Sequence, residues 1–254
     1  MKIATWNVNS IKVRLPIVSD WLQTHGVDVL MLQEIKTTEF PTAEFEKIGY
    51  RCEFVGQKAY NGVATLTKIA GADPVKALAG DAADEHARFL AMTINGVRVI
   101  NIYLPNGNPI GTEKFAYKLA WMQRLKSEIQ SMLDAEIPFV VGGDFNVIPD
   151  DIDCSDPKLW VNDALAQPET RALWRSMLHL GTVDAFRAVD KRPGQYSFWD
   201  YQAGAWRRNI GIRIDHFLTS PQITDRIEAC EIDKAPRALE KASDHTPVIL
   251  TLRA

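Results

Sequence analysis

Polar side chains of the kinds that bind metal ions and phosphate recur along this chain, nearly all beside strand-like apolar runs. Glu34 follows the run 29–32, and Asp144 with Asn146 follows the run 139–141. Further motifs of this kind contribute Asn7, Tyr103, Asp215, Asp244 and His245. Because ligands of open α/β sheets gather at strand ends, we expect these groups to converge on one site.

The types of side chain favour phosphate chemistry assisted by a hard metal ion. Carboxylate and carboxamide oxygens are the ligands that hard divalent cations prefer. The set adds one imidazole, His245, and contains no Ser or Cys placed as a nucleophile beside a base. This inventory argues for metal-assisted hydrolysis of a phosphate ester and against acyl transfer.

Each motif taken alone also has a simpler explanation. Glu34 could be an exposed acid at a strand end, and His245 could be a loop histidine held by a neighbouring carboxylate. The segment Gly142-Gly143-Asp144 could be a glycine turn closed by an Asx side chain. The motifs nevertheless occur together and in a consistent order, and this joint occurrence favours the functional interpretation.

Length and composition predict an ordinary globular protein. The chain has 254 residues, of which 46% are hydrophobic and 24% charged, and we expect a single domain spanning residues 1–254. No apolar run approaches the roughly 20 residues that span a bilayer. The first residues lead directly into a strand without the pattern of a secretory signal. We therefore expect a cytoplasmic protein without a membrane partner.

Cysteine and charge patterns give two further expectations. Cys52, Cys154 and Cys230 are odd in number and far apart, so we expect reduced thiols in or near the core. The net charge is −3, but charge is segregated: segment 171–213 has eight Lys/Arg and three Asp/Glu, and segment 134–156 has seven acids and no base. A basic face beside an acidic cation site is the expectation.

The apolar patterns predict strands that alternate with helices. Strands are expected over residues 2–8, 27–33, 50–55, 62–67, 88–94 and 97–104. The dipeptide Asn95-Gly96 between the last two favours a type I′ hairpin. A helix is expected around residues 15–24, with Pro16 tolerated in its first turn.

Two longer helices follow from helical spacing. Segment 112–136 should form one, ended before Pro138, with the apolar face Phe115, Leu119, Met122, Ile129 and Met132. Segment 168–180 should form the other, ended by Gly181. The segment 150–163 has the composition of a surface loop. The whole pattern predicts an α/β protein with two mixed sheets packed face to face and helices outside.

Eight motifs stand in order along the chain: IATWNVN (3–9), LQEIK (32–36), YNGVA (60–64), NIYLPNG (101–107), GDFNV (143–147), YSFWDY (196–201), GIRID (211–215) and SDH (243–245). With them the sequence resembles the exonuclease III family of abasic-site endonucleases, within the endonuclease/exonuclease/phosphatase superfamily. The resemblance covers essentially the whole chain. The motifs around Tyr103, Phe198 and Asp215 are those typical of its DNA-repair branch.

The resemblance implies a four-layer α/β sandwich and a divalent cation, normally Mg²⁺, for which Mn²⁺ can substitute. It implies hydrolysis of the DNA phosphodiester on the 5′ side of an abasic nucleotide, with 3′ to 5′ exonuclease and 3′-end processing, as in base excision repair. The partner would be double-stranded DNA with abasic or blocked 3′ ends. The protein would act as a monomer, associated with the nucleoid in a bacterial cell.

The resemblance also assigns metal ligands by motif. Glu34 would be the principal ligand, with Asn7 close by. Asp144 and Asn146 would lie near the metal, and Asp144 would orient or deprotonate the attacking water while Asn146 helps hold that water or the phosphate. Asp244 would have a supporting role near the metal.

Three more residues complete the implied catalytic set. His245 would contact the scissile phosphate, and Asp215 would fix its ring and favour the charged imidazole. Tyr103 would support the developing charge or the leaving oxygen.

The resemblance implies which residues contact the abasic sugar, but it does not settle which residues contact the rest of the DNA. Phe198 would line the pocket for the extruded abasic sugar, with Ile212 and Ile214 as its other walls. Vertebrate members carry Trp where Ile212 stands. Plausible phosphate or groove contacts, each of which could equally be a solvated surface group, are Lys12, Arg14, Lys58, Tyr60, Arg207 and Arg208.

Two other functions compete with this interpretation. One is a phosphatase or phosphodiesterase of the same superfamily that acts on lipids or inositol phosphates, which the motifs around Tyr103 and Phe198 disfavour. The other is a DNA-binding protein that has lost catalysis, which the complete set of acids and His245 disfavours. The sequence does not rank abasic-site incision against exonuclease or 3′-phosphatase activity.

Overall fold

Strand-like runs from both ends of the chain form the first of two sheets in the computed structural model, which describes residues 1–253. The strand order is β11-β12-β1-β2-β4-β3. These strands are β1 (Lys2–Asn7), β2 (Val29–Gln33), β3 (Arg51–Val55), β4 (Val63–Thr67), β11 (Ile227–Ile232) and β12 (Val248–Leu252). Only β1 and β2 pair in parallel, and their other neighbours are antiparallel.

The second sheet comes from the middle of the chain and has the order β5-β6-β7-β8-β10-β9. Its strands are β5 (Gly71–Val75), β6 (Phe89–Ile94), β7 (Val97–Tyr103), β8 (Phe139–Asp144), β9 (Val183–Asp184) and β10 (Asp215–Thr219). Here β7 and β8 form the parallel pair. The hairpin between β6 and β7 is confirmed, since Asn95 and Gly96 have φ angles of 50° and 76°, both positive as a type I′ turn requires.

Strand direction brings the polar motifs to one edge of the sandwich. The strands β1, β2, β7 and β8 all end there. The antiparallel strands β12 and β10 begin there, because each pairs with a strand that ends at this edge. In the register of the second sheet Asp144 lies opposite both Tyr103 and Asp215. The expected convergence of these motifs is therefore confirmed.

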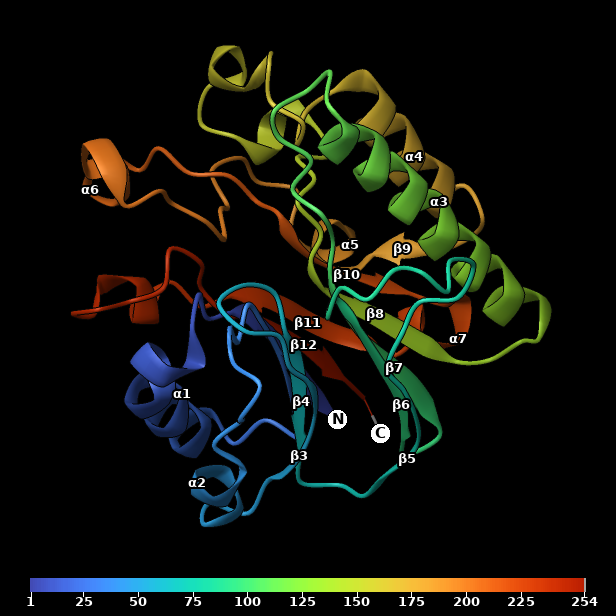
Figure 1. Ribbon diagram of the computed structural model, residues 1–254, viewed down its shortest axis with the longest axis vertical. Coiled ribbons are helices and arrows are strands. Elements are labelled where there is room, and N and C mark those ends of the chain that lie inside the picture. The colour runs from blue at the N-terminus through green and yellow to red at the C-terminus, as the bar shows by residue number, and fades with distance from the viewer. Residues whose placement is uncertain (254) are drawn as a thin grey trace.

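Helices cover the outer face of each sheet (Figure 1). The first sheet carries α1 (Ile11–His25) and α2 (Thr42–Glu46), and the second carries α3 (Glu113–Asp134) and α4 (Pro168–Leu178). Short helices complete the chain: α5 (Ala185–Val189), α6 (Ala205–Arg208), α7 (Pro221–Thr224), and the 3₁₀ turns η1 (Asp151–Asp153), η2 (Pro157–Trp160), η3 (Gln202–Gly204) and η4 (Ala235–Ala238). The four-layer α/β sandwich is confirmed. Over residues 1–253, no helix is both long and apolar enough to cross a membrane.

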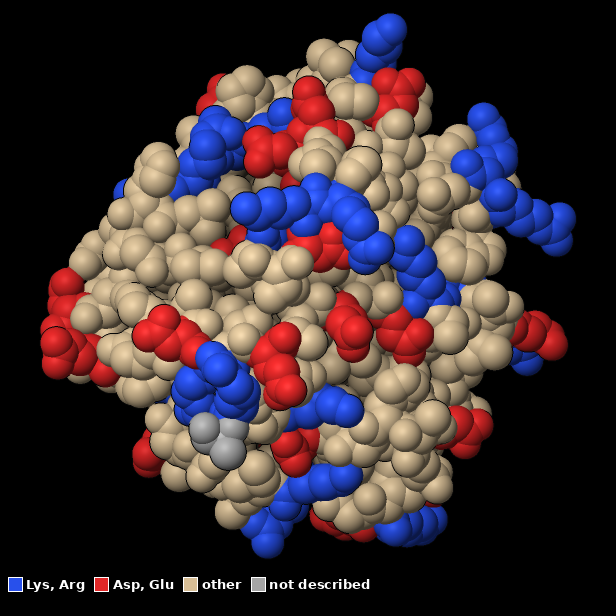
Figure 2. Space-filling view, turned by 180° about the vertical axis from the view of Figure 1, so that it is seen from behind, with Lys and Arg blue, Asp and Glu red and all other residues tan. Residues whose placement is uncertain are grey.

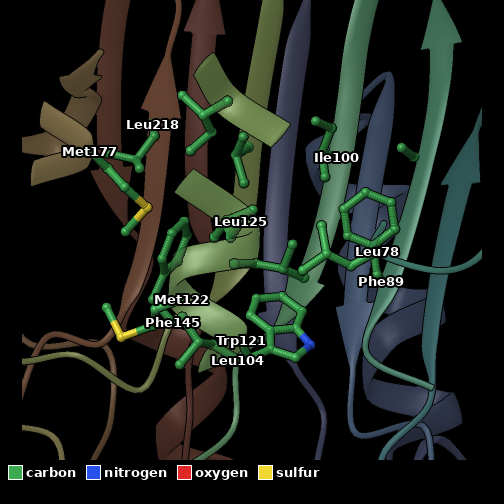
Figure 3. Packing of buried hydrophobic residues seen from close by; sticks show 14 of the residues in the cluster. Leu78, Phe89, Ile100, Leu104, Trp121, Met122, Leu125, Phe145, Met177 and Leu218 are labelled. Atoms are coloured by element: carbon green, nitrogen blue, oxygen red, sulfur yellow. The ribbon is translucent and has the colours of Figure 1, made fainter. Parts of the chain in front are cut away.

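Three layers of buried apolar side chains hold the sandwich together. One lies between the sheets and includes Ile3, Val140 and Phe217. A second lies under α1 and α2. The third packs α3 and α4 against the second sheet, with Trp121 and Phe145 among its largest members (Figure 3). Burial of this area from water on both faces of each sheet is the main force that aligns the strands. The three cysteines are free, as expected.

The helices differ from expectation at their ends and on one face. Helix α1 begins at Ile11, four residues before the predicted start, because Ile11 is itself buried in the core. Pro16 therefore lies in the second turn, where its ring removes a helical hydrogen bond. Helix α4 ends at Leu178, before Gly181. On α3 the predicted Phe115 and Leu119 are only half-buried, and the fully buried position between them is a lysine.

The segment 150–163 is more than a surface loop. It contains the 3₁₀ turns η1 and η2, and Asp153 in it is only 1% exposed. Asp153 accepts hydrogen bonds from Arg213 at 2.8 Å and from Arg187. The polar sequence of segment 150–163 suggested a surface loop. The burial of Asp153 could not be predicted from it, because the arginines that neutralise Asp153 are distant along the chain.

Ion pairs neutralise part of the basic charge that the sequence concentrates in segment 171–213. Arg213 is fully buried and pairs with Asp153 and Asp184. Within segment 171–213, ion pairs also engage three more bases: Arg171, Arg187 and Arg192. Folding thus places half of the eight bases against nearby acids. On the face shown in Figure 2, positive and negative side chains are interspersed.

Replacing Gly143 with Ala should test how closely β8 must approach β7. A Cβ atom at Gly143 would overlap the carbonyl oxygen of Ile102, so the strands must separate, and we expect a loss of roughly 2–4 kcal/mol of unfolding free energy. The control is Gly96→Ala, where nothing lies within 4 Å and only the left-handed backbone costs about 1 kcal/mol. Urea denaturation measures both, and equal losses would contradict the close approach.

Candidate active site

The side chain of Asn7 joins the two sheets at the site. Asn7 is the last residue of β1 and is fully buried. Its Nδ2 donates hydrogen bonds to Glu34 Oε1 and to Asp144 Oδ2, each at 2.9 Å. Glu34 follows β2 in the first sheet, whereas Asp144 ends β8 in the second. One amide therefore fixes the separation of two carboxylates that belong to different sheets.

Glu34 is held as a charged carboxylate. Its backbone has a φ of +50°, an uncommon conformation for a residue other than glycine and one that clusters at functional sites. Lys36 Nζ lies 2.8 Å from Oε2. Burial alone would raise the pKa of Glu34, but Lys36 and the Asn7 amide outweigh burial, so the pKa lies below its ordinary value.

His245 and Asp215 form a buried ion pair. His245 Nδ1 lies 2.9 Å from Asp215 Oδ2, which also accepts a hydrogen bond of 2.6 Å from Ser197 Oγ. Burial would lower the pKa of His245, but the charges of Asp215 and Asp144 outweigh it and raise the pKa to about 10. The imidazole is therefore positively charged at neutral pH and points its Nε2 toward Asp144 at 3.7 Å.

The pKa of Asp144 shifts in the opposite direction from that of Glu34, because Asp144 is fully buried close to another acid. Burial raises its pKa to about 7; the charge of Asp215 adds to this rise, while His245 opposes it. Oδ1 accepts a hydrogen bond from the backbone N–H of Asn146 at 2.9 Å. A carboxylate whose pKa lies near the working pH can accept a proton during a reaction. A cation bound beside it would lower that pKa.

Tyr103 ends β7 and supplies a neutral phenol. The Arg88 guanidinium lies 4.7 Å from the centre of its ring and donates a hydrogen bond of 3.1 Å to its carbonyl oxygen. Burial and the charges of Glu34 and Asp144 raise the pKa of Tyr103 well above its usual value. Its hydroxyl therefore keeps its proton and can donate a hydrogen bond.

These groups open into a cavity of about 290 Å³. Its lining residues are Glu34, Tyr103, Asn106, Asp144, Asn146, Trp160, Asp163, Leu165, Phe198, Asp200, Ile212, Ile214, Asp244 and His245. One wall is apolar and includes Phe198, Ile212 and Ile214. The ring of Phe198 packs edge-on to His245, with 4.9 Å between the ring centres, so the apolar wall directly adjoins the charged groups.

Most residues expected at the site are brought together, but three are not. Lys12 and Arg208 are exposed, and Tyr60 is 57% exposed; none of the three lines the cavity. Their exposed positions are compatible both with contacts to DNA and with ordinary solvated surface groups. Asp244 lines the cavity, and its Oδ1 accepts a hydrogen bond of 3.2 Å from Asn9 Nδ2.

Sequence reasoning missed several residues at the site. Trp160 lines the cavity from the segment 150–163, which looked like a surface loop, and Leu165 lines it from just after that segment. No local pattern marked either residue. Lys118 is fully buried beneath Asn106 and Asn146. Burial lowers its pKa to about 7, although the charge of Asp144 opposes this. A signal for Lys118 existed, since it occupies the inward helical stripe of Met122, Leu125 and Ile129.

The donor atoms at the site suit a hard divalent cation. Asp144, Asp215 and His245 offer atoms within 4.8 Å of one another, and Asp215 Oδ1 is buried without a hydrogen-bond partner among the described residues. His245, however, is charged and bound to Asp215, so its nitrogens are poor ligands. Carboxylate oxygens of Glu34 and Asp144 remain, and oxygen is the ligand atom that Mg²⁺ prefers. The acidic groups of this site can therefore hold a metal ion.

Taken together, these groups define a site for hydrolysing a phosphate ester. A charged imidazole and a cation would neutralise the phosphate, a carboxylate near neutral pKa would accept a proton from water, and a phenol could donate to an oxygen of the substrate.

Comparisons with known proteins agree with this class. The endonuclease/exonuclease/phosphatase family model matches residues 4–245. The exodeoxyribonuclease of Bacillus subtilis is 32% identical over 99% of both chains. An AP endonuclease from Archaeoglobus fulgidus is 38% identical, with a TM-score of 0.96 over 100% of both chains. A 3′ phosphatase from Neisseria, solved with a product DNA hairpin, is 37% identical, with a TM-score of 0.97 over 100% of both chains.

The chain belongs to the endonuclease/exonuclease/phosphatase family. Its similarity to exodeoxyribonucleases and AP endonucleases makes it a nuclease of the exonuclease III type, a hydrolase of the DNA-repair branch. The resemblance inferred from the motifs is confirmed.

Asp144→Asn should alter the pH dependence of folding stability in metal-free protein. The pKa of Asp144 is about 7 when folded, above the ordinary 3.8, so the folded state binds the extra proton between these values. The stability contributed by Asp144 therefore falls as pH rises from about 4 to about 7. Asn does not titrate, so the stability of the variant relative to wild type should increase across this window. Urea unfolding with chelator measures it; a difference independent of pH would contradict the raised pKa.

Proposed function

We propose that this protein is a Mg²⁺-dependent DNA-repair nuclease that hydrolyses the phosphodiester 5′ to abasic sites in double-stranded DNA. It would also remove nucleotides from 3′ ends and process blocked 3′ ends, and Mn²⁺ would substitute for Mg²⁺. We further propose that residues 1–254 act as one domain and as a monomer, in the cytoplasm with association to the nucleoid.

One observation carries this proposal. The carboxylates of Glu34 and Asp144, joined by Asn7, lie beside the charged His245 and Asp215 pair, next to a cavity that has an apolar wall. The charged side suits a phosphodiester, and the apolar wall suits a sugar without a base. The DNA hairpin bound by the Neisseria relative supports DNA as the substrate.

The residues divide the reaction among them. Asp144 accepts a proton from the attacking water, which the amide of Asn146 helps to hold. The water oxygen bonds to phosphorus, and the bond from phosphorus to the 3′ oxygen breaks. That oxygen takes a proton from solvent water and leaves as a 3′ hydroxyl, with the Tyr103 hydroxyl positioned to support it by a hydrogen bond, and Asp144 returns its proton to solvent. The products are a 3′ hydroxyl and a 5′ phosphate on the abasic nucleotide.

Two charged groups hold the phosphate during this step. His245 donates from Nε2 to a phosphate oxygen, and Asp215 keeps its ring oriented and charged. Glu34 would be the principal ligand of Mg²⁺, with Asn7, Asp144, Asn146 and Asp244 around it. When bound, the cation neutralises phosphate charge and orients the water.

The apolar wall would recognise the abasic sugar. Phe198, Ile212 and Ile214 form a recess beside His245. Extrusion costs least where no base pair must be broken, which favours an abasic nucleotide. Lys12, Tyr60 and Arg208 would then contact the flanking DNA backbone from the surface.

A second candidate is a 3′ phosphatase or 3′ exonuclease without strong abasic-site incision. The Neisseria 3′ phosphatase is as similar to this chain as the Archaeoglobus AP endonuclease is. Both activities would use the same phosphate site. They would differ in whether the loops around the site accept an internal abasic nucleotide or a 3′ end.

One assay separates the two candidates. Three labelled duplexes are offered at fixed salt, because phosphate contacts make affinity salt-dependent: one with a single internal abasic analogue, one with a 3′ phosphate and one with a recessed 3′ hydroxyl. We expect Mg²⁺-dependent incision of the abasic duplex 5′ to the lesion. Release of phosphate or nucleotides from 3′ ends with an intact abasic strand would instead support the second candidate.

Glu34→Gln should weaken the response to Mg²⁺. The amide keeps the shape of the side chain but removes the charge that attracts the cation. We expect the Mg²⁺ concentration for half-maximal rate to rise and the rate to fall by ~10²-fold. Glu39→Gln, an exposed acid nearby, is the matched control. Full activity of Glu34→Gln at low Mg²⁺ would exclude Glu34 as the principal ligand.

His245→Asn and Asp215→Asn should behave as changes to one unit. Each should lower kcat by ~10³-fold, because the charged imidazole depends on its carboxylate partner. The double variant should be little slower than the slower single variant, since residues that act together give non-additive losses. Single-turnover rates measure this. Losses that multiply would mean that the two side chains act independently.

A further inference from the structure

Lys118 lies inside the protein behind the catalytic loops. It belongs to α3 and is 0% exposed, between the helix and the second sheet. Lysine is rarely buried to this degree unless its ammonium has partners. Here the partners are backbone carbonyls: Nζ donates to Asn106 O at 3.0 Å and to Asn146 O at 2.5 Å.

The two carbonyls belong to different loops of the cavity. Asn106 follows β7 and Asn146 follows β8, and both line the site. The loops also contact each other, because Asn106 Nδ2 donates to Asn146 Oδ1 at 3.1 Å. Lys118 therefore ties together two loops that approach the site from neighbouring strands.

Asn146 needs such support because its conformation is unusual. Its φ is +47°, in the left-handed region that few residues other than glycine adopt. In this conformation its backbone N–H donates to Asp144 Oδ1, and its Nδ2 donates to Leu104 O, each at 2.9 Å. A shift of Asn146 would thus also release one oxygen of Asp144.

The loop after β7 is shaped around the lysine stem. Gly107 has a φ of +87°, and a Cβ atom there would lie 2.5 Å from Lys118 Cδ. The absence of a side chain at Gly107 lets the loop close over the lysine, so that the ammonium reaches both carbonyls.

We propose that Lys118 is a positioning residue of the nuclease reaction, which holds the loops of Asn106 and Asn146 so that Asn146 and Asp144 keep their reactive geometry. This inference rests on the roles proposed above for Asp144 and Asn146. Lys118 is fully buried and does not line the cavity, so it would touch neither substrate nor metal. Its effect on the rate passes through the backbone of Asn146.

A purely structural role makes a different prediction. If Lys118 only stabilised the fold, its replacement would lower the folded fraction and leave the kcat of folded molecules unchanged. If it positions Asn146, kcat falls in molecules that remain folded, while KM changes little because the apolar wall and the charged His245 are untouched. The split between kcat and KM separates the two roles.

Lys118→Met is the main variant, because methionine fills a similar volume without a donor. Lys114→Met is the matched control, since Lys114 is an exposed lysine of the same helix. Misplacement of reacting groups by about 1 Å can cost ~10²-fold, so we expect kcat per folded molecule to fall ~10- to 100-fold for Lys118→Met. KM should stay within about twofold, and the control should match wild type.

A double variant tests whether the effect passes through Asn146. Lys118→Met combined with Asn146→Ala should lose clearly less than the product of the two single losses, because the Asn146 side chain that Lys118 positions is already absent and only the hold on Asp144 through the backbone of residue 146 remains to be lost. If Lys118→Met does not fold, Lys118→Gln carries the same test, since its amide keeps a donor and should cause a smaller loss. Unchanged kcat per folded molecule, or losses that multiply in the double variant, would overturn the proposal.

The assay distinguishes failure of this inference from failure of the proposed function. All variants are compared with wild type on the abasic duplex, the 3′-phosphate duplex and the recessed duplex. Wild type that cleaves only 3′ ends would overturn abasic-site incision. The ratio of Lys118→Met to wild type on those ends would still support or overturn the role of Lys118.

Discussion

The site depends on the amide of Asn7, which bridges carboxylates from two separate sheets. Glu34 follows the first sheet and Asp144 ends a strand of the second, and each accepts one 2.9 Å hydrogen bond from the same Nδ2. A buried amide must have its donors satisfied, so this bridge favours one relative placement of the sheets. Burial of the apolar layer between the sheets, which includes Ile3 and Phe217, holds the sheets together. The two hydrogen bonds of Asn7 then fix the distance between the two acids.

Charge explains the remaining features of the site. Three acids, Glu34, Asp144 and Asp215, lie close together in a largely buried site, and each needs a positive neighbour. Lys36 balances Glu34 and His245 balances Asp215. Burial raises the pKa of Asp144 to about 7, because His245, which Asp144 shares with Asp215, offsets the cost of burial only in part. One oxygen of Asp215 has no hydrogen-bond partner among the described residues. A cation at the site would supply the missing positive charge, which is why this donor set fits Mg²⁺ chemically.

Much of this site could be predicted from the sequence, because strand ends are local features. Runs of apolar residues ending at Asn7, Glu34 and Asp144 place these groups at the edge of a sheet whatever the strand order. The sequence could not reveal partners distant along the chain. The burial of Arg213 against Asp153, the cavity positions of Trp160 and Leu165, and the exposure of Lys12, Tyr60 and Arg208 all follow from pairings that only the complete fold defines. Lys118 lay within reach of sequence reasoning, but a charged residue in an apolar stripe was not read as buried.

The position of a bound metal ion tests the central claim most directly. Two placements are chemically distinct: beside the carboxylates of Glu34 and Asp144 that Asn7 joins, or within the cluster of Asp144, Asp215 and His245. Crystals grown with Mn²⁺ would locate the ion by anomalous scattering. We expect an ion roughly 2.1 Å from an oxygen of Glu34, with the hydrogen bond between His245 and Asp215 intact. An ion coordinated by His245 and Asp215, with Glu34 still paired to Lys36, would contradict this account.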